Sequence, residues 1–521
     1  TMALLRSAST VAAMTMISRV LGFVRDVLMA SVIGTGLIAD AFVVAFRFPN
    51  LFRRLFAEGA FNAAFVPLFA RRLEGEGQPA ATRFAEEVLA CLLVFLISLS
   101  ALAMLAMPLI IYVLAPGFID NPEKLDLTVQ LTRIAFPYLT FMSLVALVGG
   151  IQNSLHRFTA AAAAPIILNI VLIAVLAFVL LSGWDAEPRT GFALVWGVSA
   201  AGLLQFIMLW VAMTRAGVSL KLRRPTITPG VRRLVVLGVP GLIAGGITQI
   251  NLLVSTMIAS LQDSAPSWLY YADRIYQLPL GVIGIAIGVV LLPELSRRLR
   301  ADDSKGVHSS QNRALEISLL LTIPSAVALM AMPHPIIHVL FERGAFDADD
   351  ARATSIALAA FAAGLPAFVM IKVFSPAYFA REDTRTPMWF ALISVIINIA
   401  GALALFPFMA YVGVALATTA AGWVNALLLG YTLSKRGDFS LDQRMRKALP
   451  RIIACSLAMG FVLLGAMQFV SPLFNADTLF IVRLAMLAAM VASGAAVYFA
   501  IAWWTGALDV AALKQSFSRR S

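Results

Sequence analysis

The sequence predicts an all-α polytopic membrane protein with about 14 transmembrane helices, arranged as two repeated sets of six and two more at the C-terminal end. Three observations favour this fold class. The 521 residues are 60% hydrophobic and only 13% charged, whereas an average soluble domain has about 25% charged residues. Apolar runs long enough to cross a bilayer, about 20 residues each, follow one another along the chain. Short motifs from the first half recur in the second half.

The apolar runs give the positions of the expected spans. The first run has an N-terminal positive charge but no small-residue cleavage site, so it is expected to be a retained span rather than a signal peptide. Cys91 and Cys455 lie inside apolar runs, where cysteine most often acts as a small buried hydrophobe, so no redox role is expected. By length and composition the spans fall at residues 8–33, 37–70, 84–115, 127–154, 160–182, 190–214, 232–261, 266–296, 312–341, 350–379, 387–407, 411–434, 449–470 and 479–505.

The basic residues predict the orientation of the chain. An even number of spans puts both termini on one side, and that side collects most of the 40 Lys and Arg residues. Because positively charged loops stay on the cytoplasmic side, both termini are expected to be cytoplasmic. The net charge of +12 follows from this topology, so no nucleic-acid partner is needed to explain it. The basic loops include 71–83, 221–233, 297–313 and 435–451, and the acidic loops of the opposite side include 120–126, 185–187 and 347–350.

The two halves of the chain share short motifs. Ile-Ile-Tyr-Val-Leu at 110–114 recurs as Ile-Ile-His-Val-Leu at 336–340, and Asn169-Ile170 recurs as Asn398-Ile399. Six spans per repeat give both halves the same orientation, as in transporters that move two lobes about a midplane site. The repeat divides the chain into an N-terminal lobe at 1–225, a C-terminal lobe at 226–445 and a final segment at 446–521.

Charged residues inside the first two spans indicate a binding site. A charge at mid-bilayer costs about 2.5–3.5 kcal/mol on insertion scales, so such residues usually face a protein interior or a wet cavity on a substrate pathway. One arginine could instead reach the membrane surface with its long side chain, but several on two helices are hard to place that way. We therefore expect an anion-binding cavity inside a transporter. The charged residues are Arg19, Arg25, Asp26, Asp40, Arg47, Arg53, Arg54 and Glu58.

Helical spacing suggests which of these charges pair with each other. Arg19 and Asp26 share a face, so Arg19 is either an internal ion-pair partner or a substrate ligand. Arg25 points about 120° away from Arg19, although the adjacent Asp26 could help it. In the second span, Arg54 and Glu58 form a favourable i,i+4 pair.

The second half carries a related segment with less charge. Tyr-Tyr-Ala-Asp-Arg at 270–274 precedes Pro279, just as a proline lies within the charged part of the second span. Guanidinium groups match phosphate oxygens with two parallel hydrogen bonds and keep their charge when desolvated. Arg25, Arg53 and Arg274 are therefore the expected ligands of a diphosphate.

No cofactor, metal site or enzyme chemistry is predicted. The 4 histidines show no metal-ligand spacing, and the chain has no glycine-rich loop ending in Lys-Ser or Lys-Thr that would bind ATP. Lys372 in the tenth span is either an ion site or structural, and the structural interpretation is favoured. These observations favour a transporter over an enzyme.

Several motifs together resemble those of a known family. They are Ser-Arg-Val-Leu-Gly-Phe-Val-Arg-Asp at 18–26, Ala-Asp-Ala-Phe at 39–42, Phe-Pro-Asn-Leu-Phe-Arg-Arg-Leu-Phe-Ala-Glu-Gly-Ala-Phe at 48–61, Phe-Val-Pro at 65–67, Tyr-Tyr-Ala-Asp-Arg at 270–274 and Phe-Glu-Arg-Gly-Ala-Phe at 341–346. In these segments the chain strongly resembles the MurJ (MviN) lipid II flippases, which belong to the multidrug/oligosaccharidyl-lipid/polysaccharide exporter superfamily. The similarity covers the whole chain, and the arginine-bearing motifs are specific.

The resemblance implies two six-helix lobes around a central cavity with alternating access, and a groove for a polyprenyl tail on the last two spans. It implies translocation of lipid II, the undecaprenyl-diphosphate-linked peptidoglycan precursor, from the cytoplasmic to the outer leaflet of a bacterial inner membrane during cell-wall synthesis. The implied substrate-binding residues are Arg19, Arg25, Asp26, Asp40, Asn50, Arg53, Glu58 and Arg274.

Other functions are weighed against this one. A drug or organic-cation antiporter of the same superfamily would need unpaired cavity carboxylates, whereas Asp26, Glu58 and Asp273 each have an arginine adjacent or one turn away. A flippase for another polyprenyl-linked oligosaccharide would share the diphosphate site. A membrane scaffold that recruits cell-wall synthesis proteins would leave the buried arginines unexplained. The sequence gives no pattern for a coupling ion, a gate order or an oligomeric state.

Overall fold

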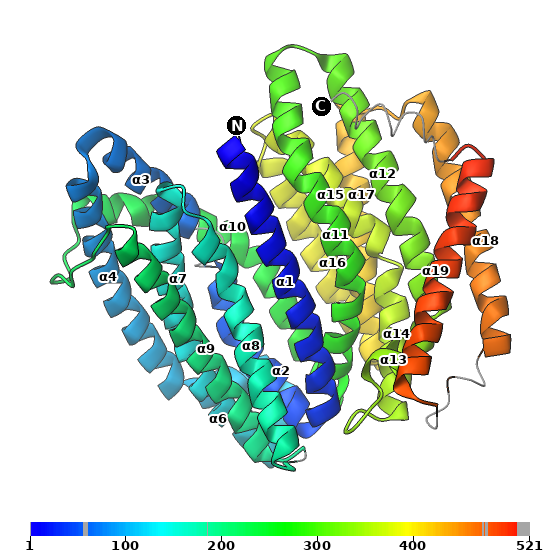
Figure 1. The fold of residues 1–521 in the computed structure, drawn as a ribbon, viewed down its shortest axis with the longest axis horizontal. Helices are drawn as coiled ribbons and strands as arrows, with labels where there is room; N and C mark the ends of the chain where they lie inside the picture. Colours follow the sequence, from blue (N-terminus) through cyan, green and yellow to red (C-terminus); the bar gives the residue numbers. More distant parts are fainter. Residues whose placement is uncertain (1, 56–60, 185, 471–473, 475–477, 508–521) are drawn as a thin grey trace. The chain divides into compact units, whose positions relative to one another are not determined.

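The computed structural model describes residues 2–55, 61–184, 186–470, 474 and 478–507, which form α-helices joined by short loops. Within these ranges the only sheet-like pairing is an isolated bridge between Arg343 and Phe346. The chain forms two compact units, and Figure 1 colours it along the sequence. Unit 1 contains Thr1–Ser267 with Arg343–Phe346, and unit 2 contains Trp268–Glu342 with Asp347–Ser521. The predicted all-α polytopic fold class is confirmed.

Unit 1 is a helical bundle. Its elements are α1 (Met2–Ile33), α2 (Leu37–Arg53), α3 (Phe61–Glu76), α4 (Gln78–Leu105), α5 (Met107–Leu114), the short 3-10 helix η2 (Pro116–Phe118), α6 (Pro122–Ala135), α7 (Pro137–Ser154), α8 (Thr159–Leu181), α9 (Pro188–Arg215) and α10 (Pro229–Ala259). α1 packs along α8, α2 along α6, and α8 along α9. α10, which the repeat assigns to the second half, packs against α3, α4 and α5.

Unit 2 contains the remaining helices. They are α11 (Ala265–Arg300, whose first residues belong to unit 1), α12 (Ser304–Ala331), α13 (Pro333–Phe341), α14 (Ala348–Ala362), α15 (Leu365–Phe379), α16 (Arg385–Met409), α17 (Tyr411–Lys435), α18 (Gln443–Val470) and α19 (Phe480–Trp504). α16 packs along α17, and α12 contacts both α15 and α18. α18 and α19, which lie outside the repeat, pack on each other and on α12.

Four spans predicted as continuous helices are broken in the structure. The breaks lie at Ala106 between α4 and α5, at Phe136 between α6 and α7, at Met332 between α12 and α13, and at Gly364 between α14 and α15. In each case a proline occupies one of the first two positions of the following helix, where its missing N–H removes a bond to the preceding turn. The breaks fall at matching positions of the two halves, so the halves share them as well as their motifs.

Two helices lie in the predicted second span, 37–70. α2 and α3 cover most of it, and residues 56–60 between them lie outside the described part of the chain. This segment includes Glu58, so the predicted pair of Arg54 with Glu58 also lies outside the described residues.

Ten helical segments within the described residues are long and apolar enough to cross a membrane. Each coincides with a predicted span: α4, α6 with α7, α8, α9, α12, α14 with α15, α16, α17, α18 and α19. The other four predicted spans fall on α1, on α2 with α3, on α10 and on α11. The chain is thus a multi-pass membrane protein, and the count of fourteen spans stays a prediction.

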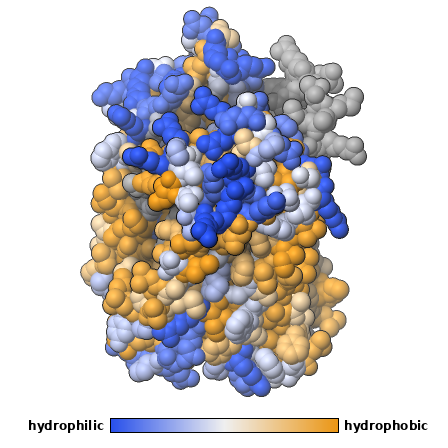
Figure 2. Space-filling model, turned by 90° about the vertical axis from the view of Figure 1, so that its left-hand side faces the viewer, coloured by the Kyte–Doolittle hydropathy of each residue, from blue (hydrophilic) through white to orange (hydrophobic). Residues whose placement is uncertain are grey.

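One face of unit 1 carries a broad band of apolar side chains between two hydrophilic ends (Figure 2). Exposed apolar residues of α4 and α9 include Phe95, Leu102 and Trp196, whose exposed fractions are 49%, 66% and 62%. Soluble monomeric proteins rarely expose apolar patches of this extent. This surface is therefore suited to contact with lipid.

Cysteine accessibility tests the predicted orientation. In a variant without the two native cysteines, single cysteines at Gln78 or Lys305 should react with a membrane-impermeant reagent only from the cytoplasmic side, because their loops are basic. Cysteines at Glu123 or Asp349 should react only from the outer side. All four positions are exposed. Labelling of any one of them from the wrong side would contradict the predicted topology.

Candidate functional site

Arg25 in α1 is held through all three of its guanidinium nitrogens. Its Nε and Nη2 donate to Oδ1 of Asp26 at 3.0 and 2.7 Å, and its Nη1 donates to Oδ1 of Asn169 in α8 at 3.0 Å. Asn169 in turn donates from Nδ2 to the backbone oxygen of Ser18 at 2.8 Å. Arg25 is 7% exposed and Asp26 is 2% exposed. The guanidinium is thus fixed between its own helix and α8.

Helical spacing leaves two possible partners for Asp26, namely Arg19 on the same face and the adjacent Arg25. The structure shows an ion pair of Asp26 with Arg25. An arginine side chain is long enough to curl along its own helix and reach the neighbouring carboxylate. Sequence reasoning also does not identify Asn169 as a partner of Arg25, since only the packing of α1 on α8 brings them together. The one feature of the sequence that indicates a role for Asn169 is its recurrence as Asn398 in the second half.

α2 carries two further predicted arginines of the first half. Nε of Arg53 donates to Oδ1 of Asn50, one turn earlier, at 2.7 Å. Nη1 of Arg47 donates to Oγ1 of Thr256 in α10 at 2.6 Å. Asn50 therefore fixes the direction of the Arg53 guanidinium.

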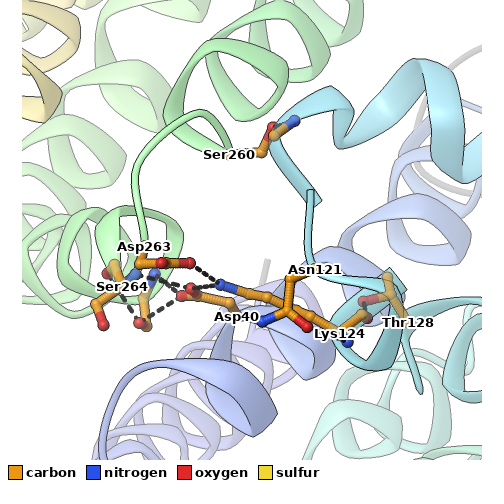
Figure 3. Close-up of polar contacts among 9 residues, drawn as sticks. Asp40, Asn121, Lys124, Thr128, Ser260, Asp263 and Ser264 are labelled. Atoms are coloured by element: carbon orange, nitrogen blue, oxygen red, sulfur yellow. Dashed lines mark hydrogen bonds and ion pairs between the residues drawn. The ribbon is translucent and has the colours of Figure 1, made fainter. Parts of the chain in front are cut away.

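Asp40, in the first turn of α2, is completely buried and is surrounded by donors (Figure 3). Its Oδ2 accepts from Nζ of Lys124 at 2.7 Å and from the amide of Ser264 at 2.9 Å. Its Oδ1 accepts from the amide and the hydroxyl of Ser267 at 3.0 and 2.6 Å. Because Ser264 and Ser267 lie at the start of α11, the carboxylate satisfies N–H groups that a helix start leaves without partners. One side chain thus connects α2, α6 and the start of α11.

Lys124 in α6 supplies the positive charge beside Asp40. It is 2% exposed, its Nζ also donates to Oδ1 of Asp263 at 3.0 Å, and this nitrogen lies 4.5 Å from the ring centroid of Phe118. The side chain of Asp263 is 88% exposed. Sequence analysis assigns Lys124 to an acidic outer loop and no role to it. Lys124 lies in the first turn of α6, where the helix dipole disfavours a cation. This unfavourable position is the sequence feature that could have indicated a buried acid as its partner.

Arg274 in α11 of unit 2 is held by a tyrosine one turn earlier. Its Nη2 lies 3.1 Å from the hydroxyl oxygen of Tyr270, and its guanidinium carbon lies 4.6 Å from the centroid of the Tyr270 ring. The aromatic face attracts the cation while the hydroxyl fixes its direction. The neighbouring carboxylate of Asp273 accepts a hydrogen bond from Gln277 on the following turn. Sequence analysis selects Arg274 but does not identify Tyr270 as its support.

The other candidates give no second site. The side chain of Lys372 in α15 is exposed, and its stem lies against Gly284 of α11, where any larger residue would collide with it. No salt bridge of Lys372 occurs within the described residues, and its structural role stays a prediction. The described ranges also contain no cluster of three or more His, Cys, Asp or Glu residues arranged for a metal ion.

Apolar helices of membrane-spanning length, breaks repeated in two halves and arginines fixed inside helices define a multi-pass α-helical membrane transporter. The family model described as lipid II flippase MurJ matches residues 29–485, and the chain belongs to this family.

Relatives and solved structures agree with this assignment. The chain is 49% identical over 520 residues to a probable lipid II flippase MurJ of Rhizobium meliloti, covering 99% of this chain and 97% of the relative. It is 33% identical over 516 residues to the lipid II flippase MurJ of Burkholderia cenocepacia, covering 97% and 98%. A lipid II flippase MurJ structure in an inward closed conformation matches with a TM-score of 0.77 at 27% identity, covering 94% and 97%. An inward-facing multidrug resistance transporter of the MATE family shares the fold, with a TM-score of 0.66 at 13% identity over 83% of this chain and 98% of that one.

Substitutions at Lys124 and Asp40 test whether the buried pair maintains unit 1. Lys124→Met should lower the free energy of unfolding by about 3–5 kcal/mol, because it leaves a buried carboxylate without its cation. Asp263→Asn, which removes only the exposed partner of Lys124, should change it by less than about 1 kcal/mol. Thermal unfolding of the purified variants provides the measurement. The double variant Lys124→Met/Asp40→Asn should recover part of the loss, and a double variant as unstable as the sum of its parts would contradict this account.

Proposed function

We propose that this chain translocates lipid II from the cytoplasmic to the outer leaflet of a bacterial inner membrane. The observation that carries the proposal is a set of arginines held by oxygen atoms within helices: Arg25 by Asp26, Arg53 by Asn50, and Arg274 by Tyr270. Membership of the lipid II flippase family supports lipid II as the substrate.

The diphosphate of lipid II is the group suited to these arginines. Its oxygens can accept two parallel hydrogen bonds from each guanidinium. Asn50 fixes the direction of Arg53, and Tyr270 fixes the direction of Arg274. We propose both arginines as diphosphate ligands. Arg25, which Asp26 and Asn169 hold in place, is proposed to have in addition a structural role in positioning α1.

The remaining parts of the proposal follow from this function. The two sets of six helices would expose the bound headgroup alternately to the two sides of the membrane, while the polyprenyl tail lies in lipid against α18 and α19. Both termini would be cytoplasmic, as the positive loops predict. Arg19 and Glu58 are proposed to belong to the same substrate pathway, whereas Asp40 is proposed to hold α2, α6 and the start of α11 together. A coupling ion and cell-wall synthesis proteins are further candidate partners.

The alternative of a drug or organic-cation antiporter is not favoured. Such a protein needs carboxylates that can bind a cation in its cavity. Asp26 is bound by Arg25, Asp40 by Lys124, and Asp273 by Gln277. These acids already serve the protein itself.

Variants of Arg53 and Arg274 test the assignment of the diphosphate ligands. Arg53→Ala or Arg274→Ala should weaken lipid II binding at least about 10- to 100-fold, because each lost hydrogen bond to a charged group costs about 1.5–3 kcal/mol, with little change in melting temperature. Lysine at either position should restore only part of the affinity, because it keeps the charge and loses the fork. Affinities measured with purified lipid II provide the test, and unchanged binding by both alanine variants would refute the proposed site.

Arg25 should behave differently because it belongs to a buried ion pair. Arg25→Ala should lower the melting temperature as well as binding, since it leaves Asp26 buried without a cation. Arg25→Ala/Asp26→Ala should regain much of the thermal stability. Thermal unfolding of both variants measures this difference. If Arg25→Ala is as stable as the unmodified protein, the ion pair is not a structural element.

Variants of Tyr270 test whether this residue orients Arg274 while the charge of Arg274 is kept. In Tyr270→Phe the ring remains and the hydroxyl is lost, so lipid II affinity should fall less than in Arg274→Ala. Tyr270→Leu removes the ring as well and should approach the effect of Arg274→Ala. Tyr378→Phe is a matched control, because its hydroxyl donates to the backbone of Leu429 elsewhere in unit 2. Equal affinity of Tyr270→Leu and the control would show that Tyr270 does not orient Arg274.

A further inference from the structure

A buried histidine joins α13 to α19 in unit 2. His338 in α13 is 5% exposed. Its Nδ1 lies 2.6 Å from Oε2 of Glu342, one turn along, and its Nε2 lies 3.1 Å from Nη1 of Arg483 in the first turn of α19. The ring of Phe474 meets the imidazole edge-on, with 6.5 Å between ring centroids. One of the contacts between the start of α19 and α13 therefore runs through the imidazole ring of His338.

The partners of His338 fix the position of its proton. A guanidinium can only donate hydrogen bonds, so Nε2 of His338 accepts from Arg483. The single proton of the neutral ring then lies on Nδ1 and is donated to Glu342. A second proton would have to bind at Nε2, which would turn the acceptor into an N–H that faces another N–H. The bond to Arg483 would be lost and two positive groups would face each other.

The other charged groups around His338 act in both directions. Within the described residues, Glu342 favours a protonated ring, while Arg483 from α19 opposes it. His334, one turn earlier on α13, stacks on His338 with ring centroids 5.8 Å apart, and it adds positive charge when it is protonated. Arg352 from α14 lies close enough to act electrostatically on His334. α12, which also contacts α13, ends in the apolar run 326–331.

We infer that His338 is a pH-sensitive latch: it holds the first turn of α19 against α13 while its imidazole is neutral and releases it when the ring is protonated. The rest of α19 stays attached, because Tyr498 donates to the backbone oxygen of Leu320 in α12 at 2.8 Å and Gly494 lies against Leu463 of α18. Only the end near Arg483 is expected to move. By the proposed topology this end lies on the outer side, so the latch responds to outer acidification.

The direction in which pH changes the docking of α19 depends on whether the docked or the released form of the latch binds the additional proton. The released form of the latch is the one that can accept the additional proton, because its Nε2 no longer accepts a hydrogen bond from Arg483. Acidification therefore favours the released form, and a higher pH favours the docked form. The ratio of released to docked protein rises by up to about tenfold per pH unit.

Distance measurements between two spin labels test the latch directly. The labels replace Ile481 at the start of α19 and Ile356 on α14, which are 74% and 47% exposed, in a variant whose native cysteines are serine. At pH 7.5 a single short distance is expected, and at pH 5.0 a second, longer distance. His338→Gln should keep the short distance at both pH values, because glutamine can accept from Arg483 and donate to Glu342 but does not titrate.

Two further variants make the outcome decisive. Arg483→Met removes the partner in α19 and should show the longer distance at both pH values. His334→Gln is the matched control, since it removes a neighbouring titratable ring and should keep the pH response. An unchanged distance between pH 7.5 and 5.0 in the unmodified sequence would overturn the inference. So would a response of His338→Gln equal to that of the unmodified sequence, or a short distance in Arg483→Met at both pH values.

Discussion

A charge placed inside a membrane helix must be compensated where it lies, and the positions of the helices in each unit depend on how this is done. The bonds of Arg25 to Asp26 and Asn169 connect α1 to α8, which also pack along each other. The bonds of Asp40 to Lys124 and Ser267 connect α2, α6 and the start of α11. Because a buried charge without a partner is costly, these bonds limit where the helices can lie.

The arginines proposed for the site are held in different ways. Arg25 is bound by the carboxylate of Asp26 and by Asn169 of another helix. Arg53 is oriented by an amide oxygen and Arg274 by a phenol, each one turn away on its own helix. A guanidinium with a fixed direction can present its parallel donors to a phosphate group. The charge of the partner matters at His338 as well. Its imidazole can accept a hydrogen bond from Arg483 only when the ring is neutral.

The sequence predicted much of this structure because its signals were local. Apolar length predicted the spans, and the recurrence of motifs such as 110–114 at 336–340 predicted two related halves. The breaks at Ala106 and Met332 were missed, although each is followed by proline, because the length criterion counts apolar residues and ignores lost backbone bonds.

The partners of the charged residues were harder to predict, because they depend on packing between distant segments. Asn169 approaches Arg25 only when α8 packs on α1, and Lys124 reaches Asp40 only when α6 packs on α2. Helical spacing left both Arg19 and Arg25 as possible partners of Asp26, because it considers directions around one helix and ignores the reach of a long side chain. Tyr270, by contrast, lies one turn from Arg274, so its supporting role could have been inferred from spacing alone.

The central claim is that arginines in this chain recognise the diphosphate of a polyprenyl-linked substrate. The most direct test compares the affinities of the purified protein for a polyprenyl diphosphate, the corresponding monophosphate and the uncharged polyprenol. The account predicts that affinity falls in that order and that the preference for the diphosphate weakens as salt concentration rises. Equal affinity for all three lipids would contradict it.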